Sequence, residues 1–240
     1  ADFPDLEKFI LHRLWEMDKI IKECVKTFNL HLMFTTLLNF CSNDLSAFYF
    51  DIRKDVIYCD GKKSIERRSS RTLLDIIFNY LVRWFAPSLS FTTEEAWKSR
   101  NNNSSIHLED FLITPESYKN SEVNDIWITL KQIRKVITGA LEKKRADKII
   151  GSSLEAHIDI YLEKSILEKV KNYQLDEISI TSSFELHEIT SNSKGFSLEE
   201  VSDVKVEVSK TSGQKCQRCW KYKKQLIRDE ICSRCDNAIS

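Results

Sequence analysis

The sequence predicts a mainly α-helical protein with a small α+β unit and a four-cysteine knuckle at its C-terminal end. Three observations lead to this fold class. Apolar residues recur every three to four positions through most of 1–150, they alternate with polar residues within 151–212, and two C-x2-C pairs lie within 213–240. The first period is that of amphipathic helices and the second that of half-buried strands. We therefore expect an antiparallel helical bundle, an α+β unit and a metal-binding knuckle in these three segments.

Four long helices are expected in the first segment. The first begins behind Pro4 and runs for roughly six turns, and the second covers about 32–57. The third ends before Pro87, because the residue before a proline avoids the α region. The fourth extends from about Val123 to Gly151, a residue type that commonly ends helices.

A shorter helix is expected between the third and fourth long helices. The pattern Thr92-x-x-Glu95 resembles a capping box, in which the two side chains bond the first backbone N–H groups of a helix. Four of the five tryptophans lie on apolar helical stripes, so they are expected in the core. These are Trp15, Trp84, Trp97 and Trp127.

The change of period after the fourth helix predicts strands. Apolar and polar residues alternate over 156–162, at Ile178 and Ile180, and over 204–208. A helix is expected over 165–173, between the first two of these strands. The segment 151–212 therefore predicts a small α+β unit.

The cysteines of the last segment have the spacing of a zinc site. Cys216, Cys219, Cys232 and Cys235 form C-x2-C-x12-C-x2-C. Such pairs can place four sulfurs about 3.7 Å apart around one ion, with Zn–S of about 2.3 Å. The alternative is two disulfides or unrelated thiols, which would suit an oxidising compartment. The remaining cysteines, at positions 24, 41 and 59, lie in apolar helical stretches and are expected to be structural.

Charge is unevenly distributed, although 36 basic and 36 acidic residues balance. The segments 62–71, 131–148 and 213–240 are basic, whereas 152–209 carries twelve acids against five lysines. Separate basic faces suit a polyanionic partner, and solvated helix surface is the alternative for any single run. The sequence has no apolar run of membrane-spanning length and does not begin with a signal segment, so a soluble cytoplasmic protein without a membrane partner is expected.

Several stretches resemble the anticodon-binding domain of bacterial isoleucyl-tRNA synthetases, which are class I enzymes. The resemblance is carried by Asn43–Asp55, by Arg67-Arg68-Ser69 and by Leu89–Trp97. The segment Ile150–Ala156 is similar to the start of the C-terminal region of that family, and Lys215–Trp220 to its terminal zinc element. Related enzymes for other amino acids share the helical domain, so the zinc element favours the isoleucine enzymes.

This resemblance implies tRNA anticodon recognition as the C-terminal part of an isoleucine–tRNA ligase. The parent reaction is the ATP-dependent attachment of isoleucine to its tRNA. The His-x-Gly-His and Lys-Met-Ser-Lys-Ser motifs of the catalytic domain do not occur in the chain. ATP and Mg²⁺ are therefore expected only in a missing catalytic domain, no residue here is expected to be catalytic, and the chain alone should be inactive. The expected partners are isoleucine tRNA and the catalytic and editing domains of the same parent chain, and the expected state is a monomer. The expected cofactor is one Zn²⁺ on the four cysteines.

An anticodon presents charged phosphates and partly unstacked bases, which basic and aromatic side chains can hold. Candidate contacts in the knuckle are Trp220, Arg218, Lys221, Lys223, Lys224 and Arg234. Candidates in the helices are Arg67, Arg68 and Arg71 at one helix start, and Lys143, Lys144 and Arg145 at another helix end. The alternatives are a packing role for the tryptophan, ion pairs for the arginines and the helix dipole for the last group. A zinc-stabilised protein-interaction module without RNA binding is the competing function.

Overall fold

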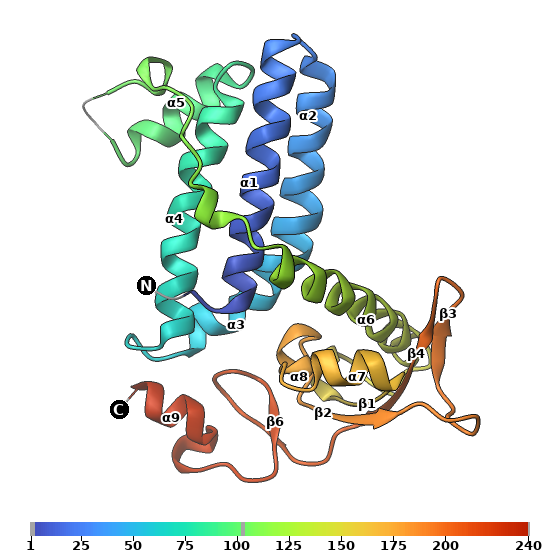
Figure 1. Cartoon of the computed structure of the whole chain (residues 1–240). Coiled ribbons are helices and arrows are strands. Elements are labelled where there is room, and N and C mark those ends of the chain that lie inside the picture. The colour runs from blue at the N-terminus through green and yellow to red at the C-terminus, as the bar shows by residue number, and fades with distance from the viewer. Residues whose placement is uncertain (1–2, 102–103, 240) are drawn as a thin grey trace. The chain divides into compact units, whose positions relative to one another are not determined.

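A computed structural model describes residues 3–101 and 104–239. The chain divides into two compact units, which are described separately (Figure 1). Unit 1 comprises Ala1–Asp51 and Lys63–Ser121, and unit 2 comprises Ile52–Lys62 and Glu122–Ser240. Among the described residues, no helix has both the length and the apolar character that crossing a bilayer requires. The division into 1–150, 151–212 and 213–240 remains a prediction.

Unit 1 is helical. Its elements are α1 (Asp5–Lys26), α2 (Leu30–Asn39), the π-helical segment η1 (Phe40–Phe50), α4 (Ile65–Phe85), α5 (Ser90–Lys98) and two 3-10 turns, η2 (Ile106–Leu108) and η3 (Glu116–Tyr118). Helix α1 packs against both α2 and α4, and α5 packs against α4 (Figure 1). The three to four residue period of apolar side chains brings Phe9, Leu14 and Leu37 into a buried core.

A buried carboxylate links three helical elements of unit 1. Glu7 on α1 is fully buried and accepts hydrogen bonds from the Tyr49 hydroxyl and from the Ser70 Oγ, both at 3.1 Å. These donors lie on η1 and α4. A buried charged group requires such partners, so this network fixes how the three elements meet.

Two predictions about unit 1 are corrected. The capping box is wrong, because α5 begins at Ser90 and its preceding residue makes no side-chain cap. Thr93 Oγ1 instead donates back to the Leu89 carbonyl at 2.9 Å. Trp84 and Trp97 are buried as expected, whereas Trp15 is only half-buried and donates through its Nε1 to Glu116.

Unit 2 combines helices with a mixed sheet. Its larger elements are most of α3 (Asp51–Cys59), α6 (Ser121–Ala146), β1 (Ala156–Leu162), α7 (Lys164–Val170), α8 (Leu175–Ile178), β2 (Ser183–Glu188), β3 (Phe196–Leu198) and β4 (Val201–Lys210), with η4 (Ser153–Glu155) before β1. The strand order is β2-β1-β4-β3, parallel between β1 and β2 and antiparallel elsewhere. The prediction of a mainly helical chain with a small α+β part is thus confirmed.

The sheet follows the predicted period at two of three places. Along β1 the residues from Ala156 to Leu162 alternate between buried and half-buried, and β4 buries Val204, Val206 and Val208. The predicted strand at Ile178 and Ile180 is wrong.

Ile178 instead ends α8, and Ile180 takes a left-handed backbone conformation with φ of 59°. Two isoleucines one residue apart are too short a pattern to separate a strand from a helix end. The fourth long helix also ends before Gly151, since α6 stops at Ala146 and Lys148 takes a left-handed conformation.

The C-terminal part of unit 2 contains little regular structure. Its elements are the two short strands β5 (Gln214–Lys215) and β6 (Tyr222–Lys223), the 3-10 turn η5 (Arg228–Glu230) and α9 (Ser233–Ile239). Strands β5 and β6 pair as an antiparallel hairpin. Its buried residues are mostly the cysteines, with Ile231 beside them, so side-chain packing alone gives this segment almost no core.

Candidate metal centre and nucleic-acid interface

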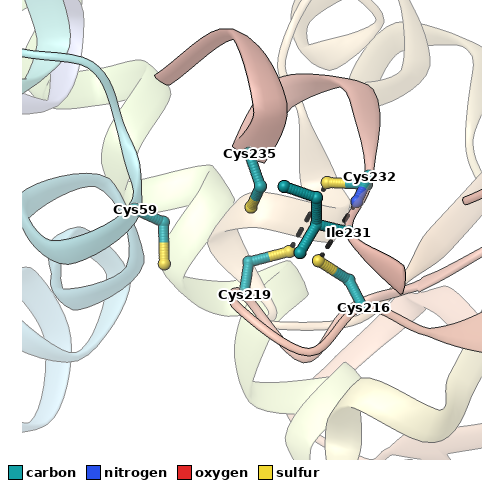
Figure 2. Packing of buried hydrophobic residues seen from close by; sticks show 6 residues of the cluster. All are labelled: Cys59, Cys216, Cys219, Ile231, Cys232 and Cys235. Atoms are coloured by element: carbon teal, nitrogen blue, oxygen red, sulfur yellow. Dashed lines mark hydrogen bonds between the residues drawn. The ribbon is translucent and has the colours of Figure 1, made fainter. Parts of the chain in front are cut away.

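The four C-terminal cysteines converge on one point. Their sulfur atoms all lie within 4.8 Å of one another, and none is in a disulfide. Figure 2 shows the four side chains directed toward a common centre. Cys219 Sγ and Cys232 Sγ are 3.8 Å apart, close to the spacing of about 3.7 Å between thiolates that share a tetrahedral ion.

Backbone donors stabilise negative charge on one of these sulfurs. The Cys232 N–H donates to Cys216 Sγ at 3.3 Å. Burial alone would raise the pKa of the Cys216 thiol, but N–H groups of Cys219, Cys232 and Arg218 outweigh burial and lower this pKa to about 6. Burial raises the pKa of Cys219 and Cys235 in the absence of an ion. A buried cluster of four thiols with such donors fits a metal ion, which would bind the thiolate form.

A fifth cysteine lies beside the cluster without belonging to it. Cys59, the last residue of α3, is buried in the same apolar group as the four thiols (Figure 2). It is not one of the four mutually close sulfurs. Burial, followed by the charge of Asp55, raises the pKa of Cys59 to about 11, which disfavours the thiolate. The structure therefore agrees with a packing role for Cys59.

Three basic residues of the knuckle, defined as the segment 213–240, contact other parts of unit 2. The Arg218 guanidinium donates to the carbonyls of Cys59 and Tyr58 at the end of α3. Arg234 on α9 forms ion pairs with Asp55 and Asp60.

Lys221 is almost fully buried, and its Nζ lies 3.0 Å from Asp176 Oδ2. The charges of Arg218, Lys221 and Arg234 are thus already engaged within the chain, so they are less suited to binding phosphate.

The other knuckle candidates are accessible. Trp220 is 59% exposed, and Lys215 Nζ lies 5.4 Å from the centre of its ring. Lys223 is half-buried and Lys224 exposed. This exposure disfavours the packing alternative for Trp220. The backbone of Trp220 is left-handed, with φ of 63°, a conformation that costs a bulky residue about 1–3 kcal/mol.

Unit 1 carries a basic pocket on α4. A shallow cavity of about 630 Å³ is lined by Arg68, Arg71, Thr72, Leu74, Asp75 and Arg100. Arg100 pairs with Asp75 and lies over the Phe78 ring at 4.6 Å. Three arginines against one aspartate leave the pocket cationic, which suits a phosphate group.

The remaining helix candidates have other positions. Arg67 is half-buried, and its backbone N–H donates to Ser64 Oγ, which caps the start of α4. At the end of α6, Lys143 is exposed, Lys144 is half-buried and Arg145 pairs with Glu142.

Sequence reasoning missed two basic residues as candidate RNA contacts. Lys215 follows a glycine-containing turn and could have been noticed by its place beside the first cysteine pair. Arg100 has no such signal, because it follows the end of α5 and reaches the pocket only through the packing of α5 on α4.

Comparison with known families identifies the chain. The model of the anticodon-binding domain of tRNA ligase matches residues 7–160. The chain belongs to this family. The matched residues include nearly all of α1 to α6 and most of β1, the first strand of the sheet. The four cysteines lie beyond them.

Relatives that match nearly the whole of this chain are named isoleucine–tRNA ligases. The enzyme of Pelagibacter ubique is 46% identical over 222 residues, which are 92% of this chain and 23% of the relative. Those of Bartonella henselae and Agrobacterium fabrum are 43% and 42% identical over 94% and 92% of the chain. The chain therefore spans about a quarter of the length of these relatives.

Proposed function

We propose that the chain recognises the anticodon region of isoleucine tRNA as the C-terminal part of an isoleucine–tRNA ligase. The observation that carries this proposal is the family match over 7–160, together with 46% identity to an isoleucine–tRNA ligase over nearly the whole chain. Activation of isoleucine with ATP and Mg²⁺ is assigned to other domains of the parent enzyme, and this chain alone catalyses nothing. Because its partner is a tRNA, we place its action in the cytoplasm.

The helices of unit 1 are proposed to form the bundle typical of class I anticodon-binding domains. Its arginine pocket supports a role in holding phosphates, because Arg68 and Arg71 present charge from one helix face. A phosphate contact positions RNA without reading its sequence. We therefore assign Arg68 and Arg71 to affinity, and propose Arg67, Lys143, Lys144 and Arg145 as peripheral contacts.

The knuckle is proposed to read RNA through Trp220. An exposed indole with Lys215 beside its ring can stack on an unpaired base, while Lys215 and the accessible Lys223 and Lys224 hold phosphates. The strained backbone at Trp220 supports this assignment, since strain persists where the surrounding structure or function requires it.

Zinc is the metal proposed for the four thiols. Cys216, Cys219, Cys232 and Cys235 would hold it in a closed, four-coordinate site without an open position for catalysis. When bound, the ion supplies structural closure of a segment that has almost no apolar core.

A titration of isoleucine tRNA into the zinc-loaded chain at several salt concentrations tests the proposal. We expect binding that weakens steeply with salt, because phosphate contacts release counterions, and that prefers isoleucine tRNA over a tRNA with another anticodon. Equal affinity for both tRNAs would reject anticodon recognition. Undetectable binding at low salt would instead favour a protein-interaction module.

A further inference from the structure

A second cluster of metal-binding side chains lies on the sheet of unit 2, away from the thiols. His157 and Asp159 are on β1, and Glu185 and His187 are on β2. The parallel register pairs Asp159 with Glu185 and Tyr161 with His187, and residues two apart share a face of a strand. These are the half-buried or exposed positions of the two strands, opposite in phase to the buried Ile158 and Ile160 of β1.

The polar atoms of this cluster are close together. One ligand atom from each of His157, Asp159 and Glu185 lies within 4.8 Å of the other two. His157 Nε2 is 3.6 Å from one Asp159 oxygen, and His187 Nε2 is 2.9 Å from the other. His187 Nε2 is also 4.0 Å from a Glu185 oxygen. Two imidazoles and two carboxylates thus meet on one face.

A neighbouring hydroxyl orients the first imidazole. His157 Nδ1 lies 2.8 Å from Ser183 Oγ, its partner across the parallel pair. With Nδ1–H donated to this hydroxyl, the Nε2 lone pair faces Asp159. A hydrogen bond on the far nitrogen is the arrangement that usually supports a metal-binding histidine.

We propose that this face binds a divalent transition-metal ion of the zinc type through His157, Asp159 and Glu185. His187, which lies beside the two carboxylates, would become the fourth donor when its ring turns toward the ion. Imidazole nitrogens select zinc, cobalt or nickel over magnesium and calcium, which prefer oxygen ligands alone. The site is chemically distinct from the knuckle, because it contains no sulfur. It joins β1 to β2 by side chains, in addition to the backbone ladder.

Modest side-chain rotation completes the site. Donors on a tetrahedral ion with bonds of about 2.0–2.2 Å lie about 3.3–3.5 Å apart. The three donors that lie within 4.8 Å of one another must therefore close by up to about 1.5 Å, and His187, which is outside this group, must turn further toward His157. The side chains of His157 and Asp159 are 23% and 26% exposed, and that of Glu185 is 66% exposed, which leaves them room to rotate. The paired strands hold their backbones in place.

Cobalt separates this site from the thiols. Co²⁺ alone is added to the full chain whose thiols already hold zinc, and bound cobalt is measured by equilibrium dialysis and absorption. We expect one additional cobalt per chain, without the intense near-ultraviolet band that cobalt thiolates give. Absence of cobalt uptake at concentrations where free imidazole and carboxylate chelators bind it would overturn the proposal.

Matched variants assign the donors. His157→Gln should weaken cobalt binding roughly tenfold or more, and Ser183→Ala roughly tenfold through loss of ring orientation. His31→Gln, at an exposed histidine of α2, should leave it unchanged. Circular dichroism and thermal unfolding verify that each variant is folded, and His187→Gln provides a second ligand variant if His157→Gln unfolds. Equal cobalt affinity in the His157 and His31 variants would also reject the site.

Discussion

Arg234 Nη2 lies 2.7 Å from Asp55 Oδ2, and Arg234 Nε lies 3.3 Å from Asp60 Oδ1. This arginine therefore joins helix α9 of the knuckle to α3 and the turn after it, within unit 2. The two contacts are ion pairs rather than well-aligned hydrogen bonds, and they raise the pKa of the guanidinium against the effect of burial. A residue that the sequence assigns to RNA thus has a structural role.

Removal of the two Arg234 ion pairs should destabilise the knuckle. Arg234→Ala is expected to lower the free energy of unfolding by about 1 kcal/mol, because the side chain is partly exposed and the pairs are screened. Its effect on tRNA affinity should be small. Chemical denaturation followed by filter binding measures both, and Arg228→Ala, which removes another α9 pair, is the control. Loss of tRNA binding with unchanged stability would show that Arg234 contacts RNA.

Metal removal should unfold the knuckle alone. Cys232→Ser, or a chelator, is expected to abolish zinc binding and to release the segment 213–240, because its buried residues are mostly the ligands themselves. The helices of unit 1 should remain. Elemental analysis and hydrogen exchange check this, with Cys24→Ser, at a buried cysteine of α1, as the control for loss of a thiol. Zinc absent from wild-type protein purified without chelator contradicts the site.

Substitution of Trp220 separates the effect of its backbone strain on stability from its effect on tRNA binding. Trp220→Gly should stabilise the knuckle by about 1 kcal/mol, since glycine adopts φ of 63° without steric cost and its greater freedom in the unfolded chain offsets part of the gain. The same change should weaken tRNA binding by about 1–3 kcal/mol if the indole stacks on a base. Zinc content, unfolding and tRNA affinity are measured together, with Trp220→Phe retaining an aromatic face. Unchanged tRNA affinity in Trp220→Gly would assign no RNA contact to the indole.

The arginine pocket should govern salt dependence. Arg71→Ala is expected to lower the slope of log affinity against log salt by roughly 1, if its guanidinium contacts one phosphate. Lys169→Ala, which removes an exposed charge from α7, should leave this slope unchanged. Filter binding at four or more salt concentrations gives the comparison. A pocket that does not meet RNA would show equal slopes for both variants.

The entry to the knuckle depends on a glycine. Gly213 has φ of 131°, and a Cβ there would lie 2.6 Å from the Lys223 carbonyl oxygen of the facing strand. Gly213→Ala should therefore destabilise the hairpin by about 1–3 kcal/mol and weaken zinc retention. Gly61→Ala is the matched control, because its Cβ would meet Ala238 at an ordinary 3.6 Å. Competition with a chromogenic chelator measures zinc retention in both variants.

Local patterns were sufficient to predict the parts of the fold that depend on period and spacing. The helical stripes, the strands at 156–162 and 204–208 and the four converging cysteines follow from residues near one another in sequence. Contacts between distant residues could not be read in this way. In the sequence, Lys221 and Arg218 resemble unpaired basic side chains. In the structure, Lys221 Nζ lies 3.0 Å from Asp176 of α8, and Arg218 donates to the end of α3.

The cluster on β1 and β2 illustrates the same limit of sequence-based prediction, here for side chains that come together rather than ones already paired. His157 and Glu185 are twenty-eight residues apart and resemble ordinary surface positions in the sequence. Only the parallel register places them on one face, and a predicted strand at Ile180 would have displaced that register.

The left-handed turn at Trp220 has an evolutionary consequence. The tryptophan codon differs from a glycine codon at a single base, so the residue that best suits this backbone is also among the most accessible mutations. A lineage under selection for folding alone would drift readily toward glycine here. Retention of tryptophan in preference to glycine at this position would therefore indicate a requirement for the exposed indole beyond folding.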